Sequence, residues 1–112
     1  MRKISAIVVI SMILFSGQTS IAGIFQNGNR LYAYMTSSYK VEKAMALGYV
    51  EGVYDSWMYI SPEMDVLIPD ELLAGQLNDI AKLYLEKHPE MRHEGAAKLI
   101  QNALLEAFSP KK

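Results

Sequence analysis

Two pairs of side chains in this sequence have types and spacings that could support chemistry. The first pair is Glu51 and Asp55, which are four residues apart and would share one face of a helix. Two such carboxylates can act as an acid and a base, or can bind a divalent cation. No Asp- or Asn-rich loop supplies the further oxygen ligands that a cation needs, so we interpret this pair as the polar edge of an apolar helix.

The second pair is His88 and His93, which flank a segment that contains Pro89 and Glu90. Two histidines near a carboxylate suggest a metal site, but their spacing differs from the one-turn spacing of zinc proteases. We therefore interpret the segment as a corner between helices, with His88 at the negative end of one and Glu90 at the positive start of the next. No phosphate-binding loop or nucleophile motif occurs. The sequence thus predicts no catalytic residue, no metal site and no cofactor.

The elements that would position these residues are helices separated by prolines. We expect a short helix through Met35 with Asn29 as its N-cap, because an Asn side chain can accept from a free backbone amide. Amphipathic patterns predict further helices near residues 39–57, from residue 71 or 73 to 86, and at 92–108. No run with the period of a strand appears. The predicted fold class is all-α, a compact four-helix bundle-like domain with a buried central helix.

The helix predicted near residues 39–57 is unusually apolar. Between Ala44 and Tyr54 its only charged residue is Glu51, and a helix that is apolar nearly all round is expected to be surrounded by others. Gly48 and Gly52 are one turn apart and lack side chains. Each costs up to about 1 kcal/mol in a helix relative to Ala, so we expect them to lie at a tight helix crossing.

The first 22 residues have the features of an export signal. Arg2 and Lys3 give a positive start, residues 4–15 are nearly all apolar, and Ser20 and Ala22 place small residues three and one before a cleavage site. The apolar stretch is shorter than the roughly 20 residues that a spanning helix needs. We expect residues 1–22 to be a cleaved secretory signal and residues 23–112 to form a single domain without a membrane anchor.

Charge and cysteine content limit which functions residues 23–112 could have and how their fold could be stabilised. Loss of Arg2 and Lys3 would leave nine basic residues against twelve acidic ones, a formal net charge of −3. Mild acidity argues against a nucleic-acid-binding protein. The chain has no cysteine, so packing, aided by a partner or a second copy, must replace the disulfides that often stabilise small exported domains.

Two apolar connectors are candidates for a binding surface. The candidates are residues 57–64, within the connector at residues 56–69, and the corner at residues 90–93. They contain Trp, Tyr, Met and Arg, which are enriched at protein interfaces. Loops of this kind can enter a cleft while the helices hold them rigid. The predicted partner-binding residues are Trp57, Tyr59, Met64, Met91, Arg92 and His93.

Ordered segments of the chain resemble a known family. Residues 42–56 resemble the central helix of the Rap/Tai family, and matching segments follow at residues 75–77, 84–90, 92–93 and 103–108. These are periplasmic immunity proteins that neutralise cell-wall amidase effectors delivered by type VI secretion. The resemblance implies an all-α periplasmic protein without catalytic activity, which blocks the active site of an amidase effector and is often a homodimer.

The sequence departs from the family pattern at three positions. Ala46 and Ser109 stand where relatives commonly carry cysteines, which predicts lower stability or more reliance on association. Leu73 stands where a Thr often caps a helix, so Asp70 is expected to cap that helix instead. The sequence leaves a second function open, that of a small periplasmic stress chaperone or an orphan binding protein of this fold. An enzyme is the least favoured class, because no site is assembled.

Overall fold

The computed structural model describes residues 25 and 27–109, and within this range the chain forms four α-helices and no strand. The α-helices are α2 (Gly28–Met35), α3 (Lys40–Ile60), α4 (Ala74–Lys87) and α5 (Ala96–Phe108), and two short 3-10 helices are η1 (Pro62–Val66) and η2 (Pro89–Met91). The all-α, bundle-like fold class is therefore confirmed. The expected export signal at residues 1–22 lies outside the described residues.

The start of α2 is fixed by residues far away in the sequence. The backbone N–H of Gly28 donates to the carbonyl oxygen of Glu94 (3.0 Å), and that of Asn29 donates to Arg92 (2.9 Å). The expected N-cap, Asn29, is wrong, because the helix begins at Gly28 and the side chain of Asn27 accepts from the N–H of Arg30 (3.0 Å). A β-carbon at position 28 would collide with the side chain of Leu99 and lie 3.0 Å from the Arg92 carbonyl oxygen. This close approach requires glycine.

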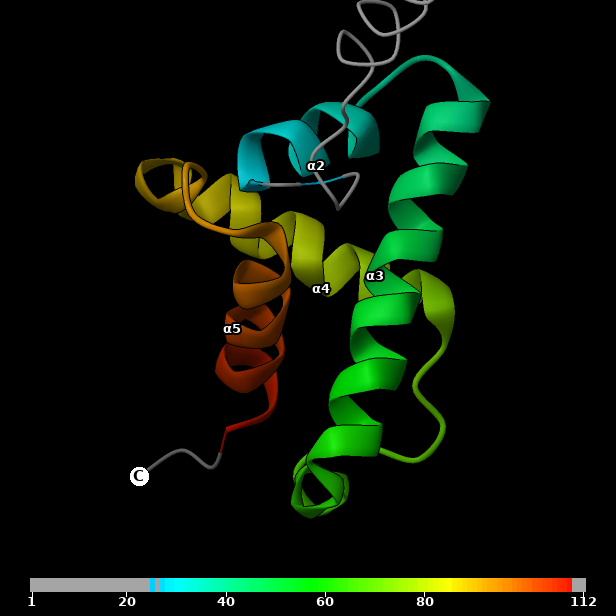
Figure 1. Ribbon diagram of the computed structural model, residues 1–112, viewed down its shortest axis with the longest axis vertical. Helices are drawn as coiled ribbons and strands as arrows, with labels where there is room; N and C mark the ends of the chain where they lie inside the picture. Colours follow the sequence, from blue (N-terminus) through cyan, green and yellow to red (C-terminus); the bar gives the residue numbers. More distant parts are fainter. Residues whose placement is uncertain (1–24, 26, 110–112) are drawn as a thin grey trace, which may run out of the picture.

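Helix α3 contacts α2, α4, α5 and η1, and is central in that sense. Figure 1 shows it as the long green helix, with α4 crossing it and α5 beside its lower half. It is nevertheless not surrounded, because only Ala46 and Val50 are buried. The tight crossing expected at Gly48 and Gly52 is also wrong, since a β-carbon at either position would meet nothing within 4 Å. An apolar helix face has here been left open rather than covered.

The two C-terminal helices begin later than the periodicity predicts. Helix α4 starts at Ala74 with Leu73 as its N-cap, whose backbone N–H donates to the Gln76 side-chain oxygen (2.9 Å), so Asp70 is not the cap. Helix α5 starts at Ala96 rather than near residue 92, because η2 and the turn after it occupy residues 89–95. The predicted stop of α4 before Pro89 is confirmed.

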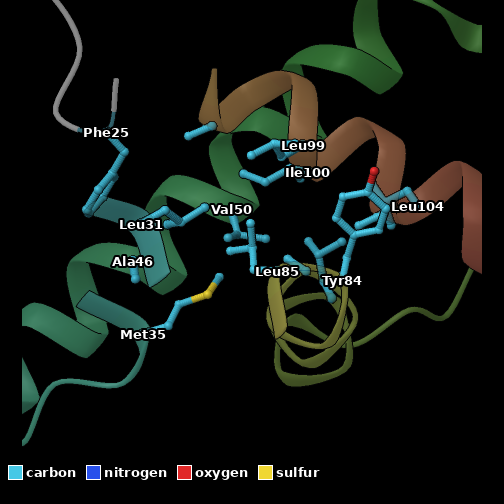
Figure 2. Close-up of a cluster of buried hydrophobic side chains, with 14 residues drawn as sticks. Phe25, Leu31, Met35, Ala46, Val50, Tyr84, Leu85, Leu99, Ile100 and Leu104 are labelled. Carbon is cyan, nitrogen blue, oxygen red and sulfur yellow. The ribbon is translucent and has the colours of Figure 1, made fainter. Parts of the chain in front are cut away.

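The core forms where α2, α3, α4 and α5 meet. Figure 2 shows Leu31 of α2, Val50 of α3, Leu85 of α4 and Ile100 of α5 converging on one cluster. Burying a side chain of this size contributes roughly 1.5–3 kcal/mol, which is how a small domain without disulfides can be held by packing. The buried cluster contains Phe25, Leu31, Met35, Ala46, Val50, Leu77, Ala81, Tyr84, Leu85, Ala96, Leu99, Ile100, Ala103 and Leu104.

Phe25 extends the core beyond the start of α2. Its ring makes edge-on contacts with the rings of Tyr34 (centroids 4.9 Å apart) and Tyr49 (5.0 Å). The Tyr49 hydroxyl donates to the Phe25 carbonyl oxygen (3.4 Å), and burial raises the pKa of this hydroxyl above its ordinary value. Phe25 thus fixes the chain that leads into α2 against α3.

Candidate protein-binding site

The open side of α3 forms one wall of a groove of about 600 Å³. The other wall is the first half of α5, which faces the middle and C-terminal part of α3 across the groove. Seven residues of α3 line it, with two from α5: Gly48, Tyr49, Gly52, Val53, Ser56, Trp57, Ile60, Ala97 and Gln101. The lining contains no charged residue. Its dimensions are those of a surface that receives a few apolar side chains.

The α3 wall of this groove contains two glycines, whose lack of a side chain makes the groove deeper. Gly48 and Gly52 are exposed, and a β-carbon placed on either of them would have no neighbouring atom within 4 Å. Both residues lower the stability of an isolated helix relative to Ala. Because no part of the described chain uses the close approach that they permit, their packing partner is not found within residues 27–109.

Large apolar side chains are exposed in the lining of the groove and next to it. Tyr59 is 89% exposed and Ile60 is 76% exposed, while Trp57 is half-buried, lines the groove and packs on the core. Exposed apolar side chains that gather next to a hollow are typical of protein-binding surfaces. Met64 lies in η1, half-buried, where its carbonyl oxygen accepts from the N–H groups of Leu67 and Ile68.

The second group of predicted binding residues lies elsewhere on the molecule. Met91 packs against the core, and its sulfur accepts from the Tyr84 hydroxyl (3.6 Å). The Arg92 guanidinium lies over the ring of Tyr32, 4.0 Å from its centroid. Only His93 is exposed. The structure therefore gives Met91 and Arg92 contacts within the fold, and the segment lies at the end of the molecule opposite the C-terminus of α3 (Figure 1).

His88 occupies the corner that the sequence predicts. It is the C-cap of α4, and its ring contacts that of Tyr84, with centroids 4.4 Å apart and the planes inclined by 41°. Its Nδ1 lies 3.3 Å from a carboxylate oxygen of Glu90, and its Nε2 lies 3.6 Å from one of Glu106. The pKa of Glu90 is held below its ordinary value, chiefly by a hydrogen bond to its own backbone and secondarily by His88. The cluster ties η2 and α5 to the end of α4.

The other residues whose side chains could support chemistry do not form a site together with the groove. Glu51 is half-buried and Asp55 is exposed on α3, and neither lines the groove. Among the described residues, no three His, Asp or Glu side chains are placed to hold a metal ion. None of the helices in this part of the chain has the length and hydropathy needed to span a membrane.

Of the residues that the sequence analysis predicted for partner binding, only Trp57 lines the groove, and the α5 wall was not predicted. Ala97 and Gln101 are one turn apart and lie just beside the apolar face of α5. This spacing was visible in the sequence. It did not indicate which residues of α3 stand opposite, because that depends on how the two helices pack.

Comparison with known proteins identifies one family. The model of a family described as Rap1a immunity proteins matches residues 27–109. No curated protein matches the chain, and no solved structure matches it.

Proposed function

Because the chain belongs to the Rap1a immunity protein family, we propose that it binds a peptidoglycan amidase effector of type VI secretion and occludes its active site. Membership in this family supports an immunity role and the binding of an effector, and proteins of this kind are generally not catalytic. The observation that supports a binding surface most directly is the open groove between α3 and α5, with Ile60 exposed in its lining and the neighbouring Tyr59 exposed beside it. A rigid helical scaffold that presents aromatic side chains can fill the cleft of an enzyme and exclude its substrate.

The test uses the amidase encoded beside this protein, if the neighbouring reading frame encodes one with a Cys/His site. The protein and the amidase are purified, and the release of peptides from isolated peptidoglycan is followed with and without the protein. We expect equimolar protein to abolish the release, and the two proteins to elute together from a sizing column. Full amidase activity in excess protein would refute the proposal.

A stress chaperone is a second candidate, and one observation favours it. Large apolar side chains are exposed at both ends of α3, among them Tyr39 and Val41 (71% each) and Tyr59 (89%). Such side chains can also bind unfolded clients. Aggregation of unrelated proteins at low pH, measured by light scattering, separates the two functions, because only a chaperone would suppress it at substoichiometric concentration.

We also propose that the protein is exported to the periplasm after cleavage behind Ala22. The charged start, the apolar stretch and the small residues before the site support this processing. The intact mass of the protein recovered from a periplasmic extract should correspond to a chain that begins at Gly23. Recovery of a soluble chain that retains Met1 would contradict it.

A homodimer is the remaining proposal that the family suggests. The first turns of α3 expose Tyr39, Val41 and Met45, none of which lines the groove. We place a second copy on this patch, which leaves the groove free for the effector. The variant Val41→Glu should therefore shift sedimentation towards the monomer without reducing inhibition of the amidase. An unchanged sedimentation coefficient would move the dimer interface elsewhere.

A further inference from the structure

The charges of this small domain are strongly segregated along the chain. Between Lys43 and Lys82 the sequence has seven acidic residues and no Lys, Arg or His. The basic residues lie outside this stretch, in α2, the first turn of α3, the second half of α4, the turn after η2 and the start of α5, where they are mixed with five glutamates: Arg30, Lys40, Lys43, Lys82, Lys87, Arg92 and Lys98. One part of the fold therefore carries a negative field although the formal charge of the whole chain is only −1.

The acidic residues lie on the elements that carry the exposed apolar side chains. Asp55 is in α3, Glu63 is in η1, and Asp70 and Glu71 precede α4, and all four are exposed. In the described part of the chain, the ion pairs involve other residues, namely His88 with Glu90 and Glu106, and Lys98 with Glu94. The negative charges of this region are thus left for an external partner.

A second hollow differs from the groove in having acidic residues within its largely apolar lining. It has a volume of about 450 Å³ and lies between the segment before α4 and the end of α5. Glu71 and Asp79 contribute to its lining, together with the apolar residues Pro69, Leu72, Ile80 and Phe108. The groove is therefore lined by uncharged side chains, and the segment that follows α3 carries acidic residues, two of which line the second hollow.

We propose that the groove between α3 and α5 docks a protein surface in which one or two apolar side chains project from a ring of Lys or Arg residues. This rests on the proposed function and specifies the chemistry of the effector face. Opposite charges around an apolar contact raise the association rate and fix the orientation of the partner. The rest of the described domain mixes Lys and Arg with Glu, so the stretch between Lys43 and Lys82, which has acidic residues alone, attracts such a partner most strongly.

The only tryptophan of the chain provides a direct readout, because Trp57 lines the groove. Two tryptophan-free peptides serve as probes, each with a central Leu-Leu flanked on both sides by Lys-Lys or by Glu-Glu. The Lys peptide should change the Trp57 emission at low salt and bind about tenfold more tightly than the Glu peptide. Raising the salt to physiological ionic strength should reduce this difference, because the charges are exposed and screened.

Two variants test the charge and the groove separately. Glu63→Lys should weaken binding of the Lys peptide, whereas Glu86→Lys makes the same change in net charge at the far end of α4 and should have little effect. Gly52→Leu should abolish binding of both peptides without unfolding the protein, because its side chain enters the empty groove. Circular dichroism confirms that each variant is folded.

The outcomes separate this inference from the proposed function. Equal affinities for the two peptides, or no change in Trp57 emission with either, would overturn the charge-selective groove even if the amidase is inhibited. Selective binding of the Lys peptide that Gly52→Leu removes would support the groove even if no amidase is inhibited. Equal loss in Glu63→Lys and Glu86→Lys would reduce the effect to net charge and also overturn the inference.

Discussion

The Nε of Arg92 donates a 2.7 Å hydrogen bond to the backbone carbonyl oxygen of Leu85, near the end of α4. In a continuing helix this oxygen would accept from the N–H of residue 89, but Pro89 has none. Arg92 therefore supplies the donor that the proline removes. The same side chain lies over the ring of Tyr32. The backbone carbonyl oxygen of Arg92 accepts from the N–H of Asn29, so this one residue connects α2, α4 and η2.

We accordingly expect Arg92→Ala to destabilise the fold rather than only a binding surface. The loss of a charged hydrogen bond and of the contact with Tyr32 should lower the free energy of unfolding by about 2 kcal/mol. Urea denaturation followed by circular dichroism measures this change. The neighbouring variant His93→Ala is the control, since His93 is exposed and should have little effect. Equal denaturation midpoints for the two variants would show that the hydrogen bond contributes little.

Two glycine substitutions should change stability in opposite directions. Gly52→Ala should raise the free energy of unfolding by about 0.5–1 kcal/mol, because Ala favours helices and its methyl group meets no atom within 4 Å. Gly28→Ala should lower it by about 1–3 kcal/mol, because the methyl group would collide with Leu99 beside the Arg92 carbonyl oxygen. Thermal melts of both variants give the comparison. If Gly52→Ala is less stable than the parent, the result would support the tight helix crossing at Gly52 that the sequence suggested.

Exposed residues near the groove should affect binding alone. Tyr59→Ala should weaken capture of the amidase by about 1 kcal/mol or more, as expected for an aromatic anchor, and should leave the melting temperature unchanged. Trp57→Ala should lower both the affinity for the amidase and the melting temperature, because Trp57 also packs on the core. Surface plasmon resonance with Lys82→Ala as the control measures the affinities. If Tyr59→Ala and His93→Ala both bind like the parent, the interface lies on another helix face.

The lowered pKa of Glu90, caused chiefly by a hydrogen bond to its own backbone and secondarily by His88, predicts a small dependence of stability on acid. The pKa of Glu90 is lowered in the folded protein, so its contribution is fully present above the ordinary Glu value of 4.5 and is lost as the pH falls through the lowered pKa. The parent should therefore lose its stability advantage over Glu90→Gln as the pH decreases below that value. Melting temperatures of both proteins from about pH 6 to pH 3 test this. If the melting temperatures of the two proteins change with pH in parallel, the interactions of Glu90 make no difference to folding.

The sequence determined the helical elements because the signals for them are local. The periodicity of residues 74–87, the apolar face of residues 96–108 and the break at Pro89 all depend on neighbours within a few residues. The family resemblance rested on the same ordered segments and is confirmed over residues 27–109. Cap positions were less predictable. Asn27 rather than Asn29 caps α2, because backbone hydrogen bonds from a segment more than sixty residues away fix where that helix begins.

Only the tertiary structure decided which apolar and glycine residues are covered. From the sequence, Gly48, Gly52 and Gly28 could all lie at close helix contacts, yet only Gly28 does. Likewise, Arg92 is of a residue type that is common at interfaces, but its side chain contacts Leu85 and Tyr32 within the fold. The physical reason is that periodicity defines a helix face, whereas burial depends on the angle and distance at which another helix crosses it. Those are set by packing between α3 and α5, and the groove is the part of α3 that this packing leaves uncovered.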